Sequence, residues 1–226
     1  MRLKKCLAVG IIIFLINTSL LGTILIQGKI NNLTQEKDSQ YLENETYTPY
    51  LEIVLANETK TFLPTDDTYI ANLDPSEVNG DLDILATRNR YDGYYNIWEC
   101  DVLIRFDISS IPRSTTILSA SLNLYYAEWG DSNPAGRPLT IYRIKWYWKE
   151  GTVNFFKRPW IALVASDSQL VPNTVGVGMS WDVTDDVQWH VNHPLRNFGW
   201  EIKDNNYWGT YGVPTTFFYS KEYFNL

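Results

Sequence analysis

Two stretches of the sequence interleave aromatic side chains with arginine, lysine and asparagine: RNRYDGYYNIW at residues 88–98 and KWYWKEGTVNFFKRPW at residues 145–160. Sugar rings have apolar C–H faces that stack on Trp and Tyr, while Asn, Arg and Lys bind hydroxyl and carboxylate groups. We expect both stretches to be loops and to bind a glycan. The alternative for each aromatic residue is burial in the core. The candidate ligand-binding residues are Arg88, Arg90, Tyr91, Tyr95, Trp98, Lys145, Trp146, Lys157, Arg158 and Trp160.

The remaining candidates for chemistry are acidic and histidine residues. A glycosidase needs two carboxyl groups, one of them with a raised pKa, and a lyase needs a base beside a neutralising group. Nothing in the sequence marks such a pair, so we do not expect an enzyme and name no catalytic residue. His190 and His193 lack the H-E-x-x-H spacing of a zinc helix. A structural Ca²⁺ is the cofactor we consider, with carboxylates from loops as ligands. Its candidate ligands are Asp66, Asp67 and Asp182.

The first 28 residues have the pattern of an export signal. Basic residues at positions 2, 4 and 5 precede 21 uncharged residues, from Cys6 to Ile26. Such a run is either a cleaved signal peptide or a retained membrane anchor, and the sequence leaves both open. Either would place the rest of the chain outside the cell or on its surface, with membrane contact only through this N-terminal segment.

The charge of the chain limits its classes of partner, and its cysteine content limits its disulfides. The chain has 19 basic and 26 acidic residues, and the three basic residues at positions 2, 4 and 5 precede residue 28. The remainder is therefore strongly acidic, which argues against nucleic acid or an anionic membrane as a partner. Outside the leader Cys100 is the lone cysteine, so no disulfide can form within the chain; we expect it to be a small buried residue.

The organisation after the leader indicates one domain. Residues 29–46 are polar and aperiodic, as in a linker, whereas from about residue 47 apolar residues alternate with polar ones. In ILSASLNLYY, residues 117–126, Leu118 and Leu122 are expected on one face. Strands repeat at short spacing with turn residues between them and one helical turn at TDDVQWHV, so residues 47–226 are predicted to form an all-β antiparallel sandwich of jelly-roll type.

Several of these segments carry specific motifs: TDDTYI, VLIRFDISSIPRSTTILSASLNLYY, WKEGTV with RPW, WDVTDDVQ, NFGWEI and FFYSKE. In this order they resemble the DNRLRE-type domain, also called the disaggregatase-related repeat, over residues 64–221. The resemblance implies an extracellular jelly-roll module appended to polysaccharide-degrading or surface proteins, with relatives that bind alginate-like acidic polysaccharides. Within VLIRFDISSIP we expect Arg105 and Asp107 on one face as a charge pair, with Asp107 also accepting backbone N–H groups at the strand end.

The sequence departs from the family pattern at two places. Phe155 stands where the family has a tryptophan, and the chain ends at FFYSKEYFNL without the closing R-P-x-L-x-[IV] strand. A segment of that form, YTPYLEIVL, lies instead at residues 47–55. We expect it to fill the vacant position, either in its own domain or in a neighbouring copy by strand exchange. The alternative is that it is the remnant of a lost repeat.

Three functions from different classes follow from these observations. The first is an exported, non-catalytic carbohydrate-binding module for an acidic cell-surface or matrix polysaccharide. The second is a structural or adhesive surface protein that self-associates, through the strand at residues 47–55 in one version. The third, least favoured, is a polysaccharide lyase or glycosidase. A surface of exposed aromatic and basic side chains would favour the first function. An exposed strand edge or apolar patch would favour the second.

Overall fold

The computed structural model describes residues 47–91, 94, 96–207, 209 and 211–223. These residues belong to one compact unit. The N-terminal segment and linker, residues 1–46, lie outside them, as does Tyr95. Among the described residues, no helix has the length and apolar character needed to cross a membrane.

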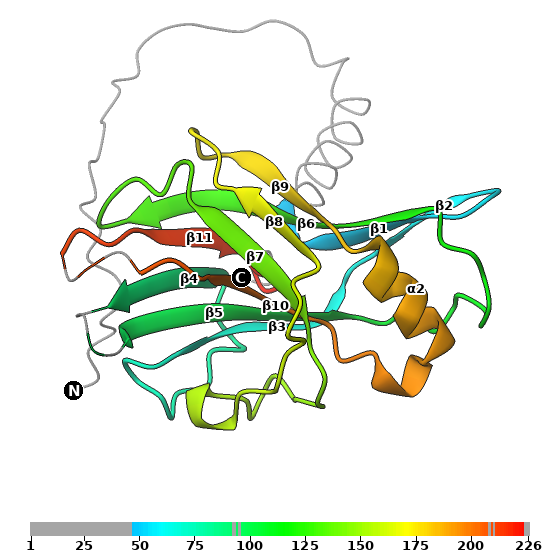
Figure 1. Cartoon of the computed structure of the whole chain (residues 1–226), viewed down its shortest axis with the longest axis horizontal. Helices are drawn as coiled ribbons and strands as arrows, with labels where there is room; N and C mark the ends of the chain where they lie inside the picture. The colour runs from blue at the N-terminus through cyan, green and yellow to red at the C-terminus, as the bar shows by residue number, and fades with distance from the viewer. Residues whose placement is uncertain (1–46, 92–93, 95, 208, 210, 224–226) are drawn as a thin grey trace, which may run out of the picture. The chain divides into compact units, whose positions relative to one another are not determined.

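The described residues form eleven strands, all paired antiparallel, in a sheet that curls on itself (Figure 1). The strands are β1 (Tyr50–Val54), β2 (Thr59–Phe62), β3 (Pro64–Ala71), β4 (Ile84–Tyr91), β5 (Asn96–Phe106), β6 (Ser119–Gly130), β7 (Pro138–Arg143), β8 (Asp167–Leu170), β9 (Val177–Asp182), β10 (Trp200–Asp204) and β11 (Thr215–Tyr219). The helical elements are η1 (Phe155–Lys157), α2 (Thr184–Asn192) and η2 (Pro194–Arg196), and α2 is longer than the predicted single turn. The fold is therefore mostly β, as predicted.

Two layers arise because β4 changes partners along its length. Residues 84–87 pair with β11, which continues through β6 to β1, β2 and β9. Residues 88–91 pair with β5, which continues to β3, β10, β7 and β8. Apolar residues from both groups of strands, such as Leu122 and Val102, pack into one main core, giving a sandwich-like arrangement.

The segment at residues 47–55 takes a place in its own sheet. β1 pairs with β6 from Tyr50↔Asn123 to Val54↔Ser119 and with β2 on its other side. Leu51 and Ile53 are fully buried in the core, as the alternation of the segment predicted. β11 pairs with β6 farther along, at residues 126–130, so β1 and β11 both use β6 as a partner. Of the two predicted placements, the structure has the one within the chain's own domain.

Two local predictions need correction. Leu118 lies before β6 and is 57% exposed, because the strand starts at Ser119. Arg105 pairs with Asp66 of β3, with 2.5 Å between Arg105 Nη2 and Asp66 Oδ2, because the β3–β5 register places Asp66 opposite it. Asp107 accepts the backbone N–H of Ser109 instead, as predicted for a strand end (2.9 Å).

A second, smaller core covers the outer face of the β3–β5 layer. The loop of residues 144–161, hereafter the 144–161 loop, contributes Trp148 and Val153, which pack with Ile70 and Leu103 of the strands. Trp148 also donates its indole N–H to the carbonyl of Phe198 (2.8 Å). Both faces of β5 are therefore buried where this loop crosses it, and the loop is held to the sheet by its own apolar side chains.

Candidate functional site

The 144–161 loop presents two stacked tryptophans to solvent. Ile144 forms an antiparallel bridge with Ile161, and the N–H of Lys145 donates to the carbonyl of Trp160 (2.7 Å), so the two ends of the loop run side by side. Trp146 and Trp160 stack with 5.1 Å between ring centroids and 5° between ring planes. They are 59% and 66% exposed, and a parallel aromatic pair in this position offers a flat apolar platform.

Basic side chains lie on the same loop. Lys145 and Lys157 are exposed, and neither has an ion pair with a carboxylate of the described part of the chain. Lys157 ends the short helix η1, and its backbone N–H donates to Oδ1 of Asn154 (3.1 Å). The structure thus brings four predicted residues, Lys145, Trp146, Lys157 and Trp160, onto one exposed loop.

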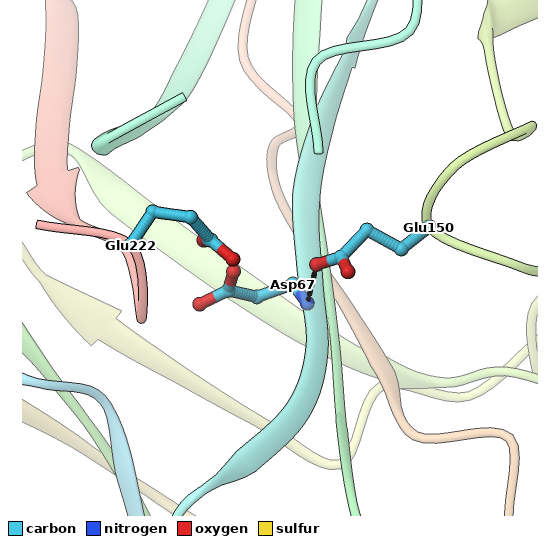
Figure 2. Close-up of side chains that lie close together, drawn as sticks. All are labelled: Asp67, Glu150 and Glu222. Carbon is cyan, nitrogen blue, oxygen red and sulfur yellow. Dashed lines mark hydrogen bonds between the residues drawn. The ribbon is translucent and has the colours of Figure 1, made fainter. Parts of the chain in front are cut away.

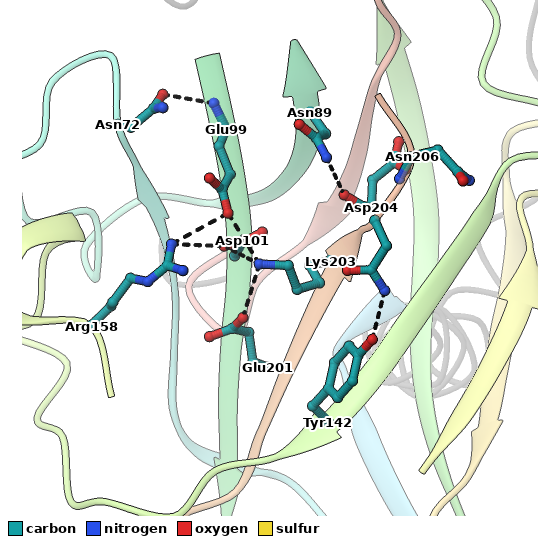
Figure 3. A network of polar contacts seen from close by, with 11 residues as sticks. Asn72, Asn89, Glu99, Asp101, Tyr142, Arg158, Glu201, Lys203, Asp204 and Asn206 are labelled. Atoms are coloured by element: carbon teal, nitrogen blue, oxygen red, sulfur yellow. Dashed lines mark hydrogen bonds and ion pairs between the residues drawn. The ribbon is translucent and has the colours of Figure 1, made fainter. Parts of the chain in front are cut away.

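Arg158, also predicted, connects this loop to a network of charges on the outer face of the β5–β10 layer (Figure 3). Its Nη1 lies 3.3 Å from Glu99 Oε1 and 3.8 Å from Asp101 Oδ2, and its side chain remains 40% exposed. Lys203 Nζ contacts Glu99, Asp101 and Glu201 at 3.0, 3.1 and 3.4 Å. Sequence reasoning missed these acidic residues because they lie inside strands and meet only through strand pairing.

The network is electrically unbalanced, and the pKa values of its members reflect this. Burial raises the pKa of Asp101 and of Glu201 above their ordinary values, while Lys203 acts against both shifts. Burial would lower the pKa of Arg158, but the carboxylates of Asp101 and Glu99 outweigh it and raise that pKa. Two cations therefore face three carboxyl groups, and the network retains protons more tightly than free side chains do.

Four predicted residues of the 88–98 stretch, Arg88, Arg90, Tyr91 and Trp98, lie on strands and not on the expected loop. Arg88 is 3% exposed and extends between the layers, where its guanidinium lies 4.0 Å from the ring centroid of Trp98. It donates to the hydroxyl of Thr215 and lies 2.5 Å from Asp131 Oδ2. Both terminal nitrogens of Arg88 are thus bound within the protein, whereas its Nε is buried without a hydrogen-bond partner among the described residues.

The other three predicted residues that the structure describes in this stretch are partly covered. Arg90 and Trp98 pair across β4 and β5, and both are partly buried. Tyr91 packs against Tyr207 with 4.4 Å between ring centroids. Strand alternation turns Arg88 and Trp98 toward the same side, which explains why one basic and one aromatic residue meet inside the sandwich.

The three predicted calcium ligands do not come together. Asp66 is paired with Arg105. Asp182 is exposed and accepts the N–H and hydroxyl of Thr184 at 2.9 and 2.6 Å, which organises the turn before α2. Asp67 alone joins a carboxylate group, described below, with Glu150 and Glu222.

The comparisons with known proteins add the family. The model of carbohydrate-binding module family 96 matches residues 58–225, which is most of the chain. This match supports the carbohydrate-binding part of the resemblance seen in the sequence, although it does not carry the DNRLRE or disaggregatase-related name. No match was found among curated proteins. The chain belongs to carbohydrate-binding module family 96.

Proposed function

We propose that the chain is an exported carbohydrate-binding module that holds an acidic polysaccharide on the 144–161 loop. Membership of a carbohydrate-binding family supplies the ligand class. The observation that carries the location is the stacked and exposed pair Trp146 and Trp160. Exposed indole rings are costly unless a ligand covers them, and pyranose C–H faces fit such a platform.

The preference for an acidic polymer rests on Lys145, Lys157 and Arg158. The first two have no carboxylate partner among the described residues, although the chain as a whole carries a formal net charge of −7. A local group of unpaired cations on an acidic protein favours a polyanionic ligand over a neutral one. Arg158 Nη1 lies 3.3 Å from Glu99 Oε1, which fixes the side chain beside the loop while part of it stays exposed.

The location of the protein is part of the proposal. Residues 1–28 would direct the chain out of the cell, as a cleaved signal or as an anchor that keeps the module on the surface. Intact-mass measurement of the protein recovered from membrane and medium separates these two forms. A mature protein that starts near residue 29 in the medium indicates a signal, and a full-length protein in the membrane indicates an anchor.

Binding is tested by affinity electrophoresis and calorimetry of the full chain with alginate, polygalacturonate and chondroitin. We expect binding to at least one of these polymers, and a Trp160→Ala variant that binds about tenfold more weakly or worse. Trp129→Ala is the matched control, because Trp129 is 45% exposed on β6, in the other layer. Equal losses in both variants would place the binding surface elsewhere.

Two alternatives remain as outcomes of the same experiment. If a folded sample binds none of the polymers, the structural or adhesive function gains support. Release of unsaturated or reducing ends from a polymer would instead indicate a lyase or glycosidase. In the first case the exposed tryptophan pair would require another explanation.

A further inference from the structure

Three carboxyl groups from distant parts of the chain meet beside β3 (Figure 2). Asp67 belongs to β3, Glu150 to the 144–161 loop and Glu222 to the segment after β11. One oxygen atom of each lies within 4.8 Å of the others. This is the one such group of three or more His, Cys, Asp or Glu residues among the residues that the structure describes.

Some oxygen atoms of this carboxylate cluster have partners within the protein. Asp67 Oδ2 accepts the backbone N–H of Lys221, and Glu150 Oε1 accepts the backbone N–H of Asp67, each at 2.9 Å. Lys221 Nζ lies 2.9 Å from Glu150 Oε1 and also pairs with Glu222. These contacts fix the three carboxyl groups in their relative positions.

Two buried oxygen atoms of the cluster have no such contact. Asp67 is 1% exposed, and its Oδ1 has no hydrogen-bond partner among the described residues. Glu222 Oε2 is also buried without a partner there. In Figure 2 the Asp67 and Glu222 carboxyl groups point toward each other. Buried polar atoms are rarely left unpaired, so these two facing oxygens need a partner between them, either a proton or a cation.

The charges lead to the same conclusion. Three carboxyl groups share one ammonium group, that of Lys221, so two negative charges are uncompensated if all three are ionised. Burial raises the pKa of Asp67 well above its ordinary value and also raises that of Glu150. Buried like charges at this distance are costly, and the cluster needs either a bound proton or a cation.

We propose that Asp67, Glu150 and Glu222 bind a hard divalent cation, Ca²⁺ foremost, with the unpartnered Asp67 and Glu222 oxygens as its principal ligands. The ligand set consists of carboxylates alone, which suits Ca²⁺ better than the thiol- and imidazole-preferring transition metals. Ca²⁺ also tolerates irregular geometry and completes its coordination with water. This site replaces the ligand set predicted from sequence, of which only Asp67 is retained.

The position of Glu150 is set by the backbone beside it. A Cβ atom at Gly80 would lie 2.4 Å from Glu150 Cγ, so Gly80 leaves just enough space for that side chain. A cation at the cluster would link β3, the 144–161 loop and the segment after β11 into one unit. The site is argued from geometry and charge independently of the proposed sugar binding.

The test is calorimetric titration of the EDTA-treated full chain with CaCl₂ at pH 7, with thermal unfolding in CaCl₂ and in EDTA. We expect saturable binding and a higher melting temperature with Ca²⁺. Glu222→Gln should weaken binding at least about tenfold and abolish the shift in melting temperature. Glu77→Gln, at an exposed glutamate outside the cluster, should behave as the wild type.

A different pattern would overturn the proposal. If the wild type takes up no Ca²⁺ and unfolds at the same temperature in CaCl₂ and EDTA, the cluster holds a shared proton instead. Asp67→Asn would then keep or raise the melting temperature at pH 7, because an amide needs no neutralising partner. Both calcium readouts are made without polysaccharide, so a failure of the proposed sugar binding does not affect them.

Discussion

Residues 88–98 and the 144–161 loop both interleave aromatic with basic side chains, yet the fold uses them differently. In the first stretch Arg88 and Trp98 contact each other between the layers, and Arg88 is 3% exposed. In the second, Trp146 and Trp160 stack in the open at 59% and 66% exposure. Similar composition is therefore built into the fold in one region and left exposed to solvent in the other.

The difference originates in local structure. β4 and β5 alternate their side chains between faces, so every second residue of these two strands must turn inward. The 144–161 loop has no such period. It is fixed by Trp148 and Val153, which leaves Trp146 and Trp160 outside. The comparison teaches that a cluster of aromatic and basic residues indicates a binding surface only where the backbone leaves it exposed.

The largest effect that could break this comparison is expected for Arg88→Ala. The change removes a buried guanidinium, its contact with Trp98 and its ion pair with Asp131, and should lower the free energy of unfolding by about 3 kcal/mol. Polymer affinity of the folded fraction should not change. Urea unfolding and calorimetry measure the two quantities, with the exposed Arg113→Ala as the control, expected within about 0.5 kcal/mol of the wild type. Lost affinity at unchanged stability would reverse our assignment.

Arg158→Ala sharpens the comparison, because the side chain of Arg158 is partly exposed on the 144–161 loop and also pairs with buried carboxylates of β5. Burial raises the pKa of Asp101 and Glu201, so the folded state holds protons that the unfolded state releases above about pH 4. Stability should therefore fall as the pH rises from about 4 toward the folded-state pKa values.

Removal of Arg158 should steepen this fall, since its charge favours the ionised carboxylates. Its side chain is 40% exposed, so we expect a loss of only about 1 kcal/mol at pH 7. Urea midpoints between pH 4 and 7 for the variant and the wild type test this. Parallel curves for the two proteins would show that Arg158 does not act on the network.

The smallest effect is expected for Lys157→Ala. Lys157 is exposed and lacks an ion pair among the described residues, so its loss should change stability by less than about 0.5 kcal/mol. Affinity for an acidic polymer should fall about two- to threefold at low salt, and the difference should vanish in high salt because the interaction is screened. Arg113→Ala should show no loss at either salt concentration. A salt-independent loss would point to a contact other than charge.

Local patterns predicted much of the fold. Alternation placed Leu51 and Ile53 in the core, and the usual burial of a lone cysteine placed Cys100 there as well. Such local patterns do not predict which distant segments pair with each other. Arg105 was assigned to nearby Asp107, whereas the partner is Asp66, 39 residues away, because the β3–β5 register determines the contact.

The sites show the same limit. Residue types drew attention to Trp146 and Trp160, whose part in binding stays a prediction, but not to their stacking, which depends on the bridge between Ile144 and Ile161. The carboxylate cluster could not be predicted, since Asp67 and Glu150 are 83 residues apart and nothing in either segment marks the other. β1 also lies before the residues matched by the family, 58–225, although it is built into the core.

The most direct test of the central claim is the alginate affinity of Trp146→Ala/Trp160→Ala beside that of Arg88→Ala, each at a temperature where circular dichroism shows it folded. We predict that the tryptophan double variant binds at least about tenfold more weakly than the wild type while Arg88→Ala retains wild-type affinity. The reverse pattern would contradict the account, because it would place the sugar on residues 88–98 and leave the exposed tryptophans without a role.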